Sequence, residues 1–132
     1  TNMVKAGING ERLSVYGGKV HCFMADEDVA VQARARGITR AAVSMEKSAM
    51  MGENYIYAIG NAPTALFRLY DLIAEEKVFP RLIIGVPVGF VHVAEAKELI
   101  MQAPVPYIVA RGRKGGSNVA AAICNALLYG ME

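Results

Sequence analysis

The sequence predicts an α/β fold, a single-domain three-layer sandwich in which a mostly parallel sheet carries helices on both faces. Three short apolar runs, at residues 55–59, 82–86 and 106–110, alternate with segments of helical periodicity. Strands separated by helices of this length are typical of parallel βαβ units with right-handed crossovers. The runs show little polar alternation, which favours strands buried on both faces. A chain of 132 residues without a linker predicts one domain over residues 1–132.

The first third of the chain is expected to be mostly helical. A short helix or turn is expected over residues 3–8, and an apolar run predicts a strand over residues 20–24. Asp26 can cap the helix that follows it, and Thr39 can cap a second helix that ends near Met51.

A helix is expected after each of the three later apolar runs. Pro63 falls in the first turn of one helix, where its missing N–H costs nothing. Another helix is expected over residues 93–101, and Ser117 can cap the last helix. The helical period predicts these buried positions: Leu66, Leu69, Tyr70, Ile73, Ala96, Leu99, Ile100, Ala120, Ile123, Cys124 and Leu127.

The turns after the three runs are the strongest functional signal. Ligands of open α/β sheets bind at the carboxyl ends of the strands, so the turns at Gly60, Gly85 and residues 112–117 should share one crevice. The last turn combines free backbone N–H groups with Arg113 and Lys114, which predicts an anionic ligand. A tight turn with solvated basic residues is the alternative.

Other polar and aromatic residues lie close to these turns in the sequence. Asn61, Thr64 and Ser117 can contact a ligand or serve as ordinary helix caps. Phe90 can line a pocket for a flat ligand or belong to the core. His92 can exchange a proton near neutral pH if it faces the crevice, or it can cap a helix or face solvent.

Composition narrows the classes of function. A net charge of +2 is too small to suggest nucleic-acid binding, and no run reaches the roughly 18 apolar residues of a membrane span. Cys22 and Cys124 lack the spacing of a disulfide framework or a metal site, and no serine–histidine triad is visible. These observations predict a cytoplasmic protein without a metal. The chain lacks the Walker A and dinucleotide fingerprints, which leaves a small nucleotide-binding domain as an unsupported alternative.

Six strings carry a resemblance that covers most of the chain. They are NMVKAGI, GITRAA, IGNAPTAL, PVGFV, EAKEL and GRKGGSNVA, in that order. Together they resemble the precorrin-8X methylmutase family, which includes cobalt-precorrin-8 enzymes of cobalamin biosynthesis. The resemblance implies a homodimeric isomerase without a cofactor that moves a methyl group between neighbouring carbons of the macrocycle. The product would be hydrogenobyrinic acid, or cobyrinic acid where the substrate carries cobalt, and the sequence leaves that choice open.

The implied substrate is a tetrapyrrole with many acetate and propionate arms, which agrees with the predicted anionic ligand. Arg40, Arg113 and Lys114 would hold carboxylates. The expected substrate-binding residues are Arg40, Gly60, Asn61, Thr64, Arg113, Lys114 and Ser117. Family members are longer at the N-terminus, where their catalytic histidine lies. We therefore expect the chain to match the family domain without that part, and no catalytic residue is assigned. A non-catalytic corrinoid-binding or assembly module is the alternative.

Overall fold

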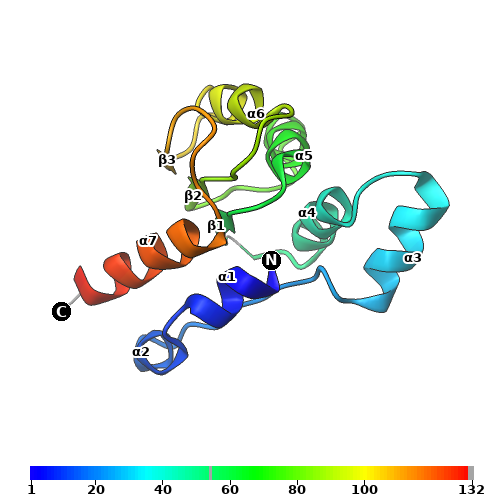
Figure 1. Ribbon diagram of the computed structural model, residues 1–132. Coiled ribbons are helices and arrows are strands. Elements are labelled where there is room, and N and C mark those ends of the chain that lie inside the picture. The colour runs from blue at the N-terminus through cyan, green and yellow to red at the C-terminus, as the bar shows by residue number, and fades with distance from the viewer. Residues whose placement is uncertain (54, 131–132) are drawn as a thin grey trace.

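A three-stranded parallel sheet lies at the centre of the computed structural model, which describes residues 1–53 and 55–130 (Figure 1). The strands are β1 (Ile56–Ile59), β2 (Leu82–Gly85) and β3 (Tyr107–Val109), in the order β1-β2-β3. Ile56 pairs with Leu82, and Ile83 pairs with Tyr107. The three predicted strands are thus confirmed, with ends that differ by a residue or two.

Helices precede the sheet and then alternate with its strands. The helices before the sheet are α1 (Asn2–Gly7), α2 (Gly10–Val15), α3 (Glu27–Arg36) and α4 (Arg40–Met50). Those that follow the strands are α5 (Pro63–Ala74), α6 (Val93–Ile100) and α7 (Ser117–Gly130). All carboxyl ends of the strands therefore lie at one edge of the sheet, as the alternation predicted.

One core cluster lies on each face of the sheet, and a further small cluster lies between α3 and α4. Ile83 is fully buried and packs with Leu66 of α5 on one face. Its neighbour Ile84 is fully buried on the other face, with Ala120 of α7 and Val4 of α1. Figure 1 shows α5 and α6 on one side of the sheet and α1 and α7 on the other. The predicted three-layer arrangement is confirmed, and each fully buried leucine or isoleucine contributes about 1.5–3 kcal/mol.

The helices α3 and α4 extend beside this sandwich, with α4 packed on α5 (Figure 1). Thr39 caps α4 as predicted, since its Oγ1 accepts a hydrogen bond from the Ala42 N–H at 3.1 Å. Asp26 precedes α3 as predicted, but its side chain makes no capping hydrogen bond. Its carboxylate instead accepts a hydrogen bond from Lys47 Nζ at 2.6 Å, which ties the start of α3 to α4.

The strand expected over residues 20–24 is wrong. These residues form irregular structure, with no strand beside them in the described sheet. Phe23 packs between α3 and α4, and Met24 packs against the core around α5. These apolar residues therefore belong to a loop, and their side chains pack between helices instead of pairing in a sheet.

One predicted buried position on α7 is also wrong. Leu127 is 39% exposed, whereas Ala121 and Leu128 are buried. The inward face is rotated because α1 lies against α7: a Cβ at Gly7 would come within 2.7 Å of the Ala121 Cβ. Four other predicted positions are only half-buried: Tyr70, Leu99, Ile123 and Cys124.

Candidate functional site

Backbone hydrogen bonds join the turns that follow the three strands. The Val86 N–H donates to the Ile59 carbonyl at 2.9 Å, which links the ends of β1 and β2. The Gly116 N–H donates to the Val86 carbonyl at 2.8 Å, and the Gly89 N–H donates to the Arg113 carbonyl at 3.1 Å. The three turns therefore lie together, as the parallel topology predicted.

Two of the glycines are required by this close approach. A Cβ at Gly60 would lie 2.7 Å from Ser117 Cα, and a Cβ at Gly115 would lie 2.0 Å from the Val86 carbonyl oxygen. Both obstacles are backbone atoms, so a side chain at either position would separate the turns. The absence of a side chain at these two glycines therefore lets the turns approach one another.

The sequence analysis did not identify Lys97, whose side chain forms hydrogen bonds with the backbone of the third turn. Lys97 of α6 is fully buried, and its Nζ donates hydrogen bonds to the carbonyls of Ala110, Gly112 and Lys114 at 2.6, 2.9 and 2.8 Å. Burial lowers the pKa of this ammonium group. The sequence contained a signal, because position 97 lies one helical turn after Val93 on the apolar face of α6.

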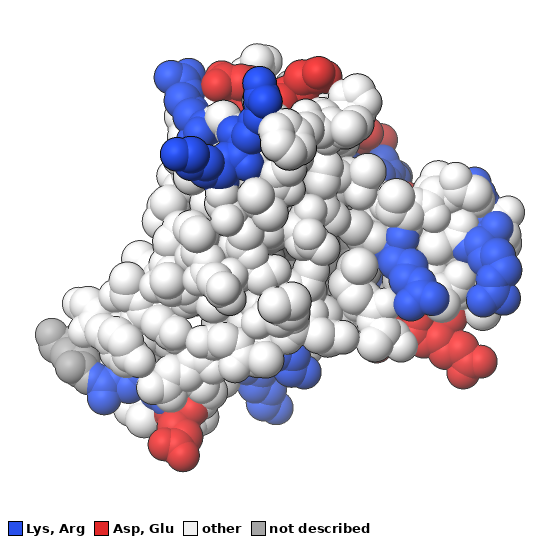
Figure 2. Space-filling view, viewed as in Figure 1, with Lys and Arg blue, Asp and Glu red and all other residues white. Residues whose placement is uncertain are grey.

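The basic side chains of the third turn are exposed to solvent. Arg113 and Lys114 are exposed, and the Arg113 guanidinium carbon lies 5.4 Å from the ring centroid of Phe90. Phe90 is itself 82% exposed, so a core position for it is excluded. Arg111 is paired with Glu98 at 3.2 Å. Lys and Arg side chains gather beside acidic ones at the top of Figure 2, at the end of the molecule where α6 lies.

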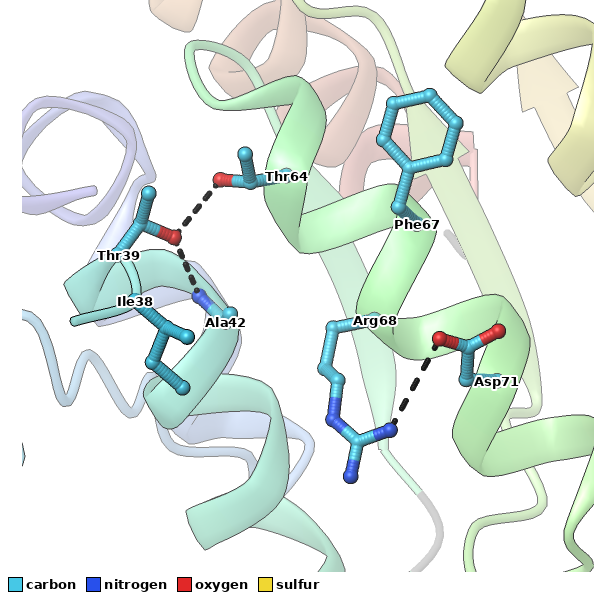
Figure 3. Close-up of a pocket in the computed structure, with 7 residues that line it drawn as sticks. All are labelled: Ile38, Thr39, Ala42, Thr64, Phe67, Arg68 and Asp71. Carbon is cyan, nitrogen blue, oxygen red and sulfur yellow. Dashed lines mark hydrogen bonds and ion pairs between the residues drawn. The ribbon is translucent and has the colours of Figure 1, made fainter. Parts of the chain in front are cut away.

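A hollow of about 320 Å³ opens between the starts of α4 and α5 (Figure 3). Its lining residues are Ile38, Thr39, Ala42, Thr64, Phe67, Arg68 and Asp71. The hydroxyl oxygen of Thr64, a predicted site residue, accepts a hydrogen bond from the Thr39 hydroxyl at 2.9 Å. Figure 3 shows the Arg68 side chain between α4 and α5, joined to Asp71 at 3.9 Å, and its Nε is also paired with Glu46 at 2.8 Å. The lining thus offers hydroxyl groups and an apolar wall, and its one arginine is already engaged.

The remaining predicted site residues, Asn61, Ser117 and Arg40, have different surroundings. Asn61 is exposed, and Ala62 rather than Asn61 is the N-cap of α5. Ser117 begins α7, with its Oγ 3.2 Å from the Thr1 hydroxyl oxygen. Arg40 is exposed at the first position of α4, next to the threonine pair of the hollow. Close backbone approach brings Gly60 and Ser117 together.

His92 lies at the helix start that follows the second turn. It is the N-cap of α6 in a left-handed conformation with φ of 60°, and its side chain is exposed. Its Nδ1 is 3.3 Å from a carboxylate oxygen of Glu95. The ring centroids of His92 and Phe67 are 6.4 Å apart, so this imidazole lies beside the wall of the hollow.

The described residues offer no ready metal centre. Within residues 1–53 and 55–130, no group of three His, Cys, Asp or Glu side chains could hold a metal ion. Cys22 and Cys124 are free, and burial raises the pKa of the Cys124 thiol. No helix among the described residues is long and apolar enough to cross a membrane.

Residues 1–130 match the family model described as precorrin-8X methylmutase. The chain is 47% identical to the cobalt-precorrin-8 methylmutase of Leptospira interrogans, with 96% of the chain and 61% of that protein covered. It is 43% identical to the precorrin-8X methylmutase of Pseudomonas aeruginosa, with 95% of the chain and 61% of that protein covered.

The fold is also found in a solved structure. The structure of the precorrin-8X methylmutase from Thermus thermophilus superposes with a TM-score of 0.88 and 38% identity, over 98% of this chain and 63% of that one. The chain therefore spans less than two thirds of the length of these relatives.

Proposed function

Because the chain belongs to the precorrin-8X methylmutase family, we propose that it binds a precorrin-8X-type tetrapyrrole polycarboxylate as part of an isomerase that shifts a methyl group on the corrin ring. The junction of the three turns carries the proposal. It joins the carboxyl ends of all three strands through backbone hydrogen bonds and leaves Arg113 and Lys114 exposed beside them.

The chemistry of the substrate fits these groups. Carboxylate arms around the edge of a macrocycle can contact several separate cations and hydroxyl groups at once. Arg113 and Lys114 would supply charge-assisted hydrogen bonds at the third turn, and Arg40 would supply one at the start of α4. Asn61, Thr64 and Ser117 would add neutral donors, with Gly60 contributing backbone.

These residues would contribute to the reaction by holding the macrocycle in a fixed orientation. An intramolecular migration needs the ring held in one geometry and a proton delivered to it more than it needs a nucleophile. Several contacts spread over the first and third turns would fix the ring in that way. We assign no catalytic residue, and a homodimer and a cytoplasmic location remain predictions.

Binding and turnover are tested separately. The chain is titrated into hydrogenobyrinic acid while the visible spectrum is recorded, and co-elution is checked at micromolar protein. A spectral shift with co-elution supports the proposal, whereas an unchanged spectrum contradicts it. Precorrin-8X and cobalt-precorrin-8 are then supplied as substrates. Product formation supports an isomerase, and binding without product favours the non-catalytic corrinoid-binding module.

A further inference from the structure

The buried lysine of α6 has an unusual set of partners. An ammonium group has three N–H donors, and those of Lys97 donate hydrogen bonds to the carbonyls of Ala110, Gly112 and Lys114. Among the described residues, the partners found for this ammonium are these three carbonyls and no carboxylate. Its positive charge is therefore solvated by the backbone of the third turn instead of being cancelled by an acid.

The three acceptors come from alternate residues of one short segment. Their carbonyls converge on a single nitrogen, which bends the backbone around Lys97. The carbonyl of Arg113 is held from another direction by the Gly89 N–H at 3.1 Å. Carbonyl oxygens repel carboxylates, so directing them toward Lys97 and Gly89 removes that repulsion from the surface beside the turn.

We propose that Lys97 is a positioning residue that shapes the third turn so that Arg113 and Lys114 can receive an anionic ligand. This inference rests on the proposed function, because the ligand is the polycarboxylate proposed above. Lys97 does not touch that ligand, since it is fully buried. It acts through the backbone of the residues that do.

The experiment compares the wild-type chain with K97M and with K77M. Lys77 is an exposed lysine paired with Glu75, so K77M makes the same change in net charge away from the turn. Amide hydrogen exchange is measured over residues 110–116. The dissociation constant for hydrogenobyrinic acid is measured by absorbance, both in each protein and in the same proteins carrying R113A and K114A.

We expect K97M to speed amide exchange in the turn and to weaken binding by about tenfold, the scale of one lost buried hydrogen bond to a charged group. K77M should match the wild type in both measurements. The loss of affinity caused by K97M should largely disappear when Arg113 and Lys114 are already alanine, because the lysine acts through them. If circular dichroism shows that K97M does not fold, K97Q is measured by the same criteria.

Two results would overturn the inference. One is wild-type exchange in the turn of K97M. The other is an equal loss of affinity with and without R113A and K114A, which would indicate a general loss of structure. A wild-type chain that fails to bind hydrogenobyrinic acid would instead refute the proposed function, and the exchange data would still judge the shaping of the turn.

Discussion

Lys97 donates a hydrogen bond from its buried ammonium to the carbonyl of Lys114 at 2.8 Å, so two lysines of the candidate site have opposite environments. The ammonium of Lys97 is enclosed, whereas the side chain of Lys114 is exposed. Removing the enclosed ammonium would leave three carbonyls to find other partners, at about 1–3 kcal/mol for each one left unsatisfied. The geometry of the exposed basic groups therefore depends on a charge that no ligand can reach.

Replacing Arg113 by alanine should weaken the binding of hydrogenobyrinic acid by roughly 1–3 kcal/mol, the scale of a charge-assisted hydrogen bond. Arg113 is exposed beside Phe90, so its loss should leave the fold intact. Arg34→Ala, at an exposed position on α3, is the matched control and should bind normally. Absorbance titration measures both, and wild-type affinity in Arg113→Ala would remove the third turn from the site.

Replacing His92 by alanine should leave the affinity for hydrogenobyrinic acid close to that of the wild type, because His92 is not among the proposed ligand contacts. The imidazole is exposed, and its polar contact is with Glu95 at 3.3 Å. The same absorbance titration with hydrogenobyrinic acid measures the affinity of this variant. A tenfold loss of affinity would instead make His92 a ligand contact.

The fold was largely predictable because its signals are local. Apolar runs that end near Gly60, Gly85 and Gly112 mark three strand ends, and the helical period marks the segments between them. The strand prediction for residues 20–24 is wrong because a short apolar run is equally compatible with an edge strand and with a loop that packs between helices. Only the positions of α3 and α4 decide between the two, and these depend on long-range contacts.

The meeting of the three turns at the candidate site was predictable because topology alone determines it. Parallel strands bring their carboxyl ends to one edge, which placed the three turns together. The role of Lys97 depends on where residues 110–114 pass over α6, which no local pattern specifies. Likewise, Thr39 was predicted as a helix cap, but its hydroxyl contact with Thr64 depends on how α4 packs against α5.

Gly115→Ala should lower the free energy of unfolding by about 1–3 kcal/mol or more, the cost of forcing extra volume into a packed site. The added Cβ would lie 2.0 Å from the Val86 carbonyl oxygen, so backbone must move. Gly10→Ala is the control, because α2 leaves open space at that position. It should stabilise by about 0.4–1 kcal/mol. Urea unfolding measures both, and equal stability of the two variants would contradict the close approach of the turns.

Thr39→Ala should destabilise the protein by about 0.5–2 kcal/mol, the usual cost of removing a helix cap. The change removes the acceptor for the Ala42 N–H and the contact with the Thr64 hydroxyl. Thr39→Ser keeps the hydroxyl and should retain most of the stability. If thermal unfolding shows the serine variant to be as unstable as the alanine variant, the threonine methyl rather than the cap is what matters.

Glu46 of α4 is paired with Arg36 of α3 and with Arg68 of α5. The stability of the protein should therefore depend on pH through the ionisation of Glu46. Hydrogen bonds from Arg36 and then Arg68 lower the pKa of this carboxyl below its ordinary value of 4.5. Because the pKa is depressed in the folded state, the ionised pair stabilises the protein above about pH 4.5 and is lost as the pH falls through the folded pKa.

Glu46→Gln removes that ionisation, so the variant should be less stable than wild type at pH 7, and the difference should shrink steadily below pH 4.5. Urea unfolding at pH 7, 5, 4 and 3 measures the difference directly. A gap between the two proteins that stays constant over this range would mean that Glu46 stabilises the helices by packing alone. The narrowing is expected because protonation gives the wild-type side chain the same neutral charge as glutamine.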